Sequence, residues 1–81
     1  MMIIKPLKEM LPLERGKITK VGGGKGIRRR LMDMGVVSGA EVLVQRIAPL
    51  GDPVEIKIKG YDLALRLEEA ANISVEIFEE S

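Results

Sequence analysis

The side chains best placed for chemistry lie in one stretch, Val21 to Gly35, which reads VGGGKGIRRRLMDMG. A glycine-rich loop that precedes a lysine and a helix can cradle phosphate groups with its backbone N–H groups. The phosphate-binding P-loop needs Ser or Thr after its lysine to hold Mg²⁺, but Gly26 follows Lys25 here. The dinucleotide-binding fingerprint also fails, because it requires glycine where Ile27 stands. We therefore interpret Gly22–Gly26 as a bend between a strand and a helix.

Catalytic and metal-ligating residues are scarce in the rest of the chain. The 81 residues include no cysteine and no histidine, which removes disulfides, thiolate metal sites, thiol nucleophiles and the commonest general base. Glu68 and Glu69 are adjacent and diverge on a helix, and Asp33, Asp52 and Asp62 are scattered through turns. The sequence therefore predicts no enzyme, with no catalytic, cofactor-binding or dedicated metal-binding residue. Weak or transient binding of a divalent cation is left open.

Charge is unevenly distributed, although the net charge is only +1. Residues 1–30 carry nine Lys or Arg against two Glu, whereas residues 67–81 carry five Glu and no basic residue. Either the two ends lie close together and neutralise one another, as the termini of small domains often do, or the first part of the chain forms a basic face.

Three consecutive arginines, Arg28, Arg29 and Arg30, cannot share one face of a helix. Together with Lys20 and Lys25 they could still form a patch that meets an acidic protein or RNA phosphates. A single Tyr and a single Phe leave almost no stacking platform for bases, so nucleic acid is not the expected partner. Lys25, Arg28 and Arg29 are therefore candidate residues for binding a protein.

A short helix is predicted directly after the glycines. Ile27, Leu31 and Met34 recur at i, i+4 and i+7, which places them on one face of that helix. Gly35 follows as a left-handed C-terminal residue. The arginines then lie on the flanks and the outer face.

Alternating apolar residues predict short strands elsewhere. One helical turn follows Pro6, a turn at Gly16 comes next, and the first strand is expected at residues 17–21. A turn at residues 37–40, with Gly39 in its third position, precedes a strand at 41–47, and the segment PLGDP leads to the next strand. The period-two sets expected on the last three strands are Val54, Ile56 and Ile58; Leu63, Leu65 and Leu67; and Ile73, Val75 and Ile77, with a helical turn in EEAAN between the last two sets.

Five short strands with little helix argue for a mainly β fold: a small antiparallel barrel with a short helix after the first strand and a helical turn before the last. The chain has room for one core, so residues 1–81 are expected to form a single domain. No apolar stretch approaches the roughly 20 residues that span a membrane, and those before Lys5 are too few for a signal peptide. The protein is therefore expected to be soluble and cytoplasmic, without membrane insertion.

Two blocks of sequence, RRRLMDMGVVSGAEVLV and APLGDPVEIKIKGYDLALRLEEAANISV, resemble the FeoA family, small cytosolic proteins of bacterial and archaeal ferrous iron transport. The likeness covers about residues 13–75, and the triple glycine Gly22–Gly24 departs from the family pattern. The resemblance implies an SH3-like β-barrel with a helix inserted after the first strand. The matching marks, in chain order, are Arg30-Leu31, Met34-Gly35, Gly39, Gly51-Asp52-Pro53, Gly60, Leu65-Arg66, Ala70 and Ile73.

The resemblance also implies a role beside FeoB, a large membrane transporter whose cytoplasmic part carries a GTP-binding domain. A member of the family is expected to bind FeoB and to assist or regulate ferrous iron uptake without being the permease or the GTPase. Weak Fe²⁺ binding and self-association stay open. Two alternatives remain, a small basic-faced β-barrel that binds nucleic acid and an SH3-like module of a metal-dependent regulator. Since the 81 residues show no DNA-binding helix-turn-helix before the module, a stand-alone protein is the expectation.

The marks divide into two groups by their expected role. Gly51-Asp52-Pro53 shapes a hairpin whose tip, with the aliphatic Leu50, is free to touch a partner, so these four residues join the three basic candidates. The remaining marks are expected to be structural: Leu31, Met34, Gly35, Gly39, Gly60, Leu65 and Ala70.

Overall fold

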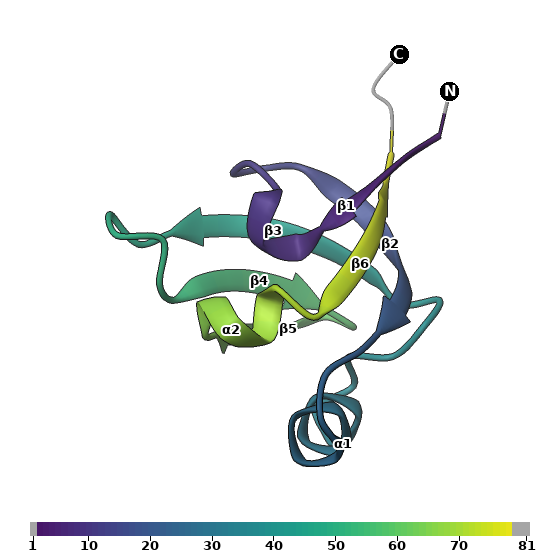
Figure 1. Ribbon diagram of the computed structural model, residues 1–81. Helices are drawn as coiled ribbons and strands as arrows, with labels where there is room; N and C mark the ends of the chain where they lie inside the picture. The colour runs from purple at the N-terminus through teal and green to yellow at the C-terminus, as the bar shows by residue number, and fades with distance from the viewer. Residues whose placement is uncertain (1, 79–81) are drawn as a thin grey trace.

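The strands pair in one curled antiparallel sheet. The computed structural model describes residues 2–78, and the strand order is β1-β6-β2-β3-β4-β5. Figure 1 shows α2 packed beside the sheet and α1 standing at one end of the molecule. The elements are β1 (Ile3–Pro6), the 3-10 turn η1 (Leu7–Glu9), β2 (Arg15–Val21), α1 (Lys25–Asp33), β3 (Glu41–Ile47), β4 (Val54–Ile58), β5 (Tyr61–Leu65), α2 (Leu67–Ala70) and β6 (Ile73–Ile77).

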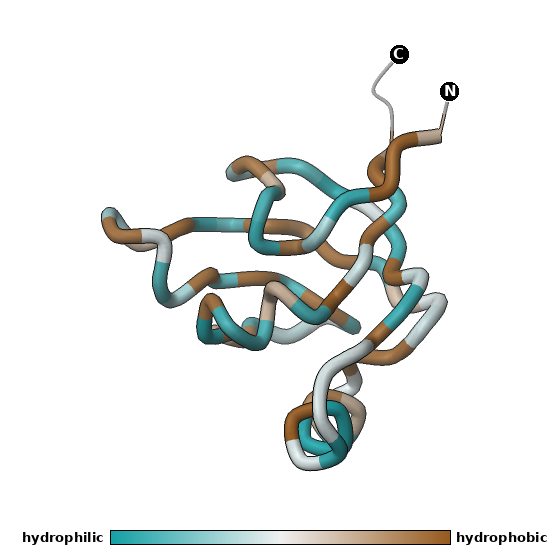
Figure 2. Tube along the Cα trace, in the orientation of Figure 1, coloured by the Kyte–Doolittle hydropathy of each residue, from teal (hydrophilic) through white to brown (hydrophobic). Residues whose placement is uncertain are grey.

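Alternating polarity gives the strands an inner and an outer face. In β4, Val54, Ile56 and Ile58 are buried, whereas Glu55 and Lys57 are exposed. Figure 2 shows apolar and polar residues interspersed along the strands. Since the inner faces meet inside the curled sheet, they form one core. Residues from outside the strands complete it: Leu7, Met10, Leu31, Val36, Ala40 and Ala70.

Two tight turns have the glycines that their geometry requires. Lys59 and Gly60 join β4 to β5 with φ angles of +49° and +82°, and a two-residue hairpin turn with positive φ at both positions matches the twist of the strands. Gly39 has a φ of +93° in the third position of the turn at residues 37–40, where the Ala40 N–H donates to the Val37 carbonyl oxygen at 3.1 Å. The predicted turn at Gly39 is therefore confirmed.

The prediction of five strands was one strand short. The missed strand, β1, pairs with β6, with Ile3 opposite Ile77. Its four residues end in proline, which weakens the local signal, and pairing with a segment far away in the sequence stabilises it. The two ends of the described chain therefore lie side by side, as one of the two readings of the charge distribution required.

The first predicted strand also began too late. β2 starts at Arg15, so Gly16 lies within the strand and not in a turn. A Cβ atom at Gly16 would lie 2.5 Å from both the Glu76 carbonyl oxygen and the Val75 Cγ1 atom. Glycine is present here because the neighbouring strand β6 approaches too closely for a side chain.

Leu67 was assigned to the wrong element. β5 ends at Leu65, and Leu67 is the first residue of α2, where its side chain is partly exposed. The alternation of Leu63, Leu65 and Leu67 continues in the sequence beyond Leu65, where the pairing of β5 with β4 ends. The helical turn predicted before the last strand is confirmed as α2.

Candidate partner-binding surface

One face of α1 docks on the barrel. Leu31 is fully buried in the core, and Ile27 and Met34 are half-buried against it. The spacing of these three residues places them on the same side of the helix, as the sequence predicted. The opposite side of α1 is consequently turned to solvent.

The C-terminal end of α1 is fixed by a Schellman motif. The Gly35 N–H donates to the Met32 carbonyl oxygen at 3.0 Å, and the Val36 N–H donates to the Leu31 carbonyl oxygen at 2.9 Å. Gly35 has a φ of +89°, so it takes the left-handed position expected from the sequence. A Cβ atom there would lie 3.0 Å from the Tyr61 hydroxyl, which shows how closely β5 approaches the end of the helix.

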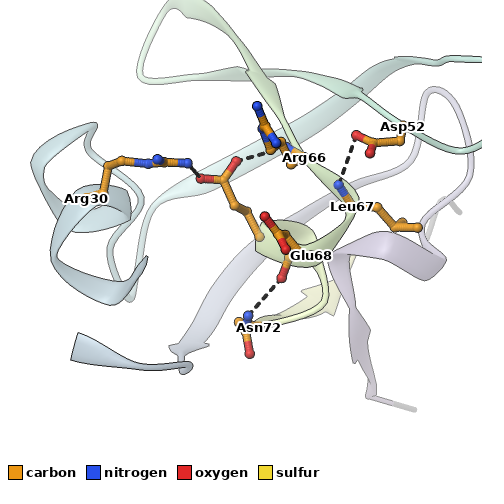
Figure 3. A network of polar contacts seen from close by, with 7 residues as sticks. Arg30, Asp52, Arg66, Leu67, Glu68 and Asn72 are labelled. Atoms are coloured by element: carbon orange, nitrogen blue, oxygen red, sulfur yellow. Dashed lines mark hydrogen bonds and ion pairs between the residues drawn. The ribbon is translucent and has the colours of Figure 1, made fainter. Parts of the chain in front are cut away.

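An ion pair joins α1 to α2. The Arg30 guanidinium donates from Nη2 to Glu69 Oε2, and the second oxygen, Oε1, accepts the Arg66 backbone N–H at 2.9 Å (Figure 3). The Glu69 side chain is only 4% exposed, whereas that of Arg30 is 61% exposed. Arg30 therefore links α1 to α2, whereas none of the ion pairs found within residues 2–78 involves Arg28 or Arg29.

Glu69 remains ionised in this environment. Burial by itself raises the pKa of the carboxyl, because it disfavours the charged form. The hydrogen bond from the Arg66 N–H, the hydrogen bond from Arg30 and the positive charges of the two arginines outweigh burial, so the pKa of Glu69 lies below its ordinary value of 4.5. Both carboxylate oxygens have a donor, which a buried charge requires.

The loop between β3 and β4 is also attached to α2. The Gly51 N–H donates to the Ala48 carbonyl oxygen at 2.7 Å, which closes the tip of the loop. Asp52 Oδ1 accepts the backbone N–H of Leu67 at 3.1 Å and thereby satisfies a donor at the start of α2 (Figure 3). Leu50 projects from this tip with 93% of its surface exposed.

The structure places the seven candidate contact residues in two separate groups. Lys25, Arg28 and Arg29 are exposed on α1, and Leu50, Asp52 and Pro53 are exposed on the β3–β4 loop with Gly51 between them. Figure 1 shows that this loop and α1 lie at different ends of the molecule. That these residues contact a partner stays a prediction. Of the residues expected to be structural, Leu31, Leu65 and Ala70 are buried, Met34 and Gly35 are half-buried, and Gly39 and Gly60 lie in exposed turns.

Sequence reasoning missed two features. A pocket of about 270 Å³ is lined by residues of β2, β3, β4 and the turn that follows β4. Met32, with 46% of its surface exposed, lies on the outer side of α1 one turn beyond Arg28 and Arg29. The spacing of Lys25, Arg28, Arg29 and Met32 could have revealed this common side, because it follows i, i+3, i+4 and i+7.

Within residues 2–78, no group of three or more His, Cys, Asp or Glu side chains comes together in a way that could hold a metal ion. None of the helices in this part of the chain is long and apolar enough to cross a membrane.

The curled sheet with an inserted helix defines the class of the protein as an SH3-like β-barrel. Residues 5–77 match the model of the FeoA domain. The chain therefore belongs to the FeoA family, whose members take part in ferrous iron transport, and both the resemblance and the fold class inferred from the sequence are confirmed.

Individual relatives agree with this assignment. The Fe(2+) transport protein A/Fe(2+) transporter FeoB fusion protein of Porphyromonas gingivalis is 39% identical over 71 residues, which are 88% of this chain but 8% of that protein. The chain thus spans a small part of the length of this curated relative. The FeoA protein of Chlorobium tepidum is 42% identical, with a TM-score of 0.86 over 95% of this chain and 73% of that one. Stenotrophomonas maltophilia FeoA, solved with zinc and described as a prokaryotic SH3 domain protein, is 29% identical, with a TM-score of 0.74 over 85% and 86% of the two chains.

The fold also occurs in transcription repressors. A manganese-dependent transcriptional repressor superposes with a TM-score of 0.86 over 93% of this chain and 42% of its own, at 13% identity. At that identity the likeness concerns the fold alone, so it gives no support to a role in regulating transcription.

Proposed function

We propose that the protein is a cytoplasmic accessory protein without enzymatic activity, which binds a FeoB-type ferrous iron transporter and modulates its activity. The observation that carries this proposal is the fusion of the two proteins in one chain of Porphyromonas gingivalis, together with the FeoA family match over residues 5–77. A covalent link raises the effective concentration of one domain at the other. Such a link is useful when the two domains work in contact.

The chemistry of the chain supports a binding role. It has no cysteine and no histidine, and within residues 2–78 its acidic side chains form no cluster able to hold a metal ion. Binding of Fe²⁺ or another divalent cation is expected to be weak, and no resident cofactor is proposed. The groups proposed to make the contact are exposed on the barrel: the basic side of α1 and the β3–β4 loop.

The experiment is a transport assay with the cognate full-length transporter in proteoliposomes. Fe²⁺ uptake and GTP hydrolysis are measured while the 81-residue chain is titrated, and binding is measured on the same vesicles. A saturable change in either rate, up or down, supports the proposal and gives the sign of the modulation. Absence of binding and of any change in rate would refute it, and salt-sensitive binding to random RNA in that case would favour a nucleic-acid-binding barrel.

A further inference from the structure

The helix α1 has two faces with separate tasks. The inner face carries the buried Leu31 and the half-buried Ile27 and Met34, and Arg30 reaches from its flank to Glu69. The outer face carries four exposed side chains in one stripe along the helix, at i, i+3, i+4 and i+7: Lys25, Arg28, Arg29 and Met32, called the α1 stripe below.

The α1 stripe carries positive charge that the described part of the chain does not neutralise. None of the ion pairs found within residues 2–78 involves Lys25, Arg28 or Arg29. The buried carboxylate nearest to the helix, Glu69, is engaged by Arg30, and the acidic residue of α1 itself, Asp33, stands at its last position. An acidic surface of a partner would therefore meet no competing carboxylate paired with these side chains within residues 2–78.

Met32 adds an apolar element to this basic surface. It is 46% exposed although it lies on the same helix as the fully buried Leu31. An unbranched, polarizable side chain between charged neighbours adapts well to an apolar pocket of a partner. A helix that presents basic residues around one apolar residue fits an acidic groove with an apolar floor.

The α1 stripe is held ready for binding. The Arg30–Glu69 ion pair, the Schellman motif at Gly35 and the burial of Leu31 fix the position of the helix on the barrel. Because the backbone is already ordered, binding does not have to offset the cost of ordering it. In Figure 1, α1 stands at one end of the molecule, so its outer side is accessible to a large partner.

We propose that the α1 stripe is the docking surface for an acidic protein surface with an apolar pocket that receives Met32. This inference rests on the proposed function, in which that surface belongs to the cytoplasmic part of the ferrous iron transporter. The proposed partner surface combines acidic groups with an apolar pocket, so the arginines and Met32 both contribute to the affinity.

The test measures binding of the full chain to the full-length transporter in nanodiscs, at two salt concentrations. The variant Arg28→Gln/Arg29→Gln is expected to bind at least about tenfold more weakly and with less dependence on salt. Met32→Gln is expected to bind about threefold or more weakly, with the salt dependence of the wild type, because it removes apolar contact and no charge. Lys8→Gln/Lys57→Gln is the matched control: it removes the same charge from exposed sites outside α1 and is expected to bind like the wild type.

Each other outcome has a definite meaning. If the α1 variants bind as tightly as the wild type, the proposed docking surface is refuted and the proposed function remains. An equal loss in the lysine control shows general charge attraction and also overturns the docking surface. Equal binding to empty nanodiscs shows attraction to lipid in place of a protein groove, and absence of wild-type binding overturns the docking surface together with the proposed function.

Discussion

Replacement of Leu31 by alanine tests whether α1 is anchored through its inner face. Leu31 has none of its surface exposed, and it contacts the core next to Val36, which is equally buried at the end of the Schellman motif. Truncation of a buried leucine costs about 2–5 kcal/mol, the upper part applying where the cavity cannot collapse. A chain of 81 residues has a total stability of about 4–12 kcal/mol, so this change removes a large share of it.

The assay is thermal and urea unfolding followed by circular dichroism. We expect the melting temperature of Leu31→Ala to fall by at least about 8 °C, since 1 kcal/mol corresponds to about 4–8 °C in a domain of this size. Met32→Ala is the matched control, because it removes a similar volume from the outer side of the same helix and costs within about 0.5 kcal/mol. Equal melting temperatures for the two variants would refute the docking of α1 through Leu31.

Three further changes test the contacts around the sheet and α2. Glu69→Gln is expected to destabilise the protein at pH 7. Because the folded-state pKa of Glu69 is lowered, the stability that its charge contributes is present above pH 4.5 and is lost as the pH falls through the folded-state pKa. If the variant and the wild type had the same urea midpoint at pH 7 and also at pH 3, the ion pair would be contradicted. Gly16→Ala should lower the free energy of unfolding in urea by about 1–3 kcal/mol, since its Cβ atom would lie 2.5 Å from atoms of the neighbouring strand. Gly26→Ala in α1 is the control: its Cβ atom meets no atom within 4 Å, so it should stabilise by about 0.5–1 kcal/mol. The reverse order of stabilities would refute the close approach of β6 to Gly16. Asp52→Ala should lower the stability by about 0.5–2 kcal/mol through loss of the bond to the Leu67 N–H, and Asp52→Asn, which keeps an acceptor, should restore most of it.

The sequence predicts the elements whose signals are local. The alternation in β4, the inner face of α1 and the left-handed Gly35 all depend on residues within one turn or one strand, and the structure has them in place. β1 escaped prediction because four residues that end in proline become a strand only through pairing with β6, some 70 positions further along the chain.

The candidate surface shows the same division. The exposed positions of Lys25, Arg28 and Arg29 follow from helical periodicity, and they were predicted. The ion pair of Arg30 could not be predicted, because its partner Glu69 is 39 residues away and is brought close only by the fold. Asp52 likewise bonds to the start of α2 across 15 residues, so a loop expected to be free at its tip is attached at its base.

The pairing of β1 with β6 determines how the molecule can be tethered. Because Ile3 lies opposite Ile77, a linker added at either terminus leaves the barrel at the same corner. Figure 1 shows α1 at the opposite end of the molecule from that corner. A barrel joined covalently to another protein is therefore attached at the same corner whether the partner precedes it or follows it in the chain. In both cases the basic helix α1 lies at the end of the barrel away from the attachment and stays accessible.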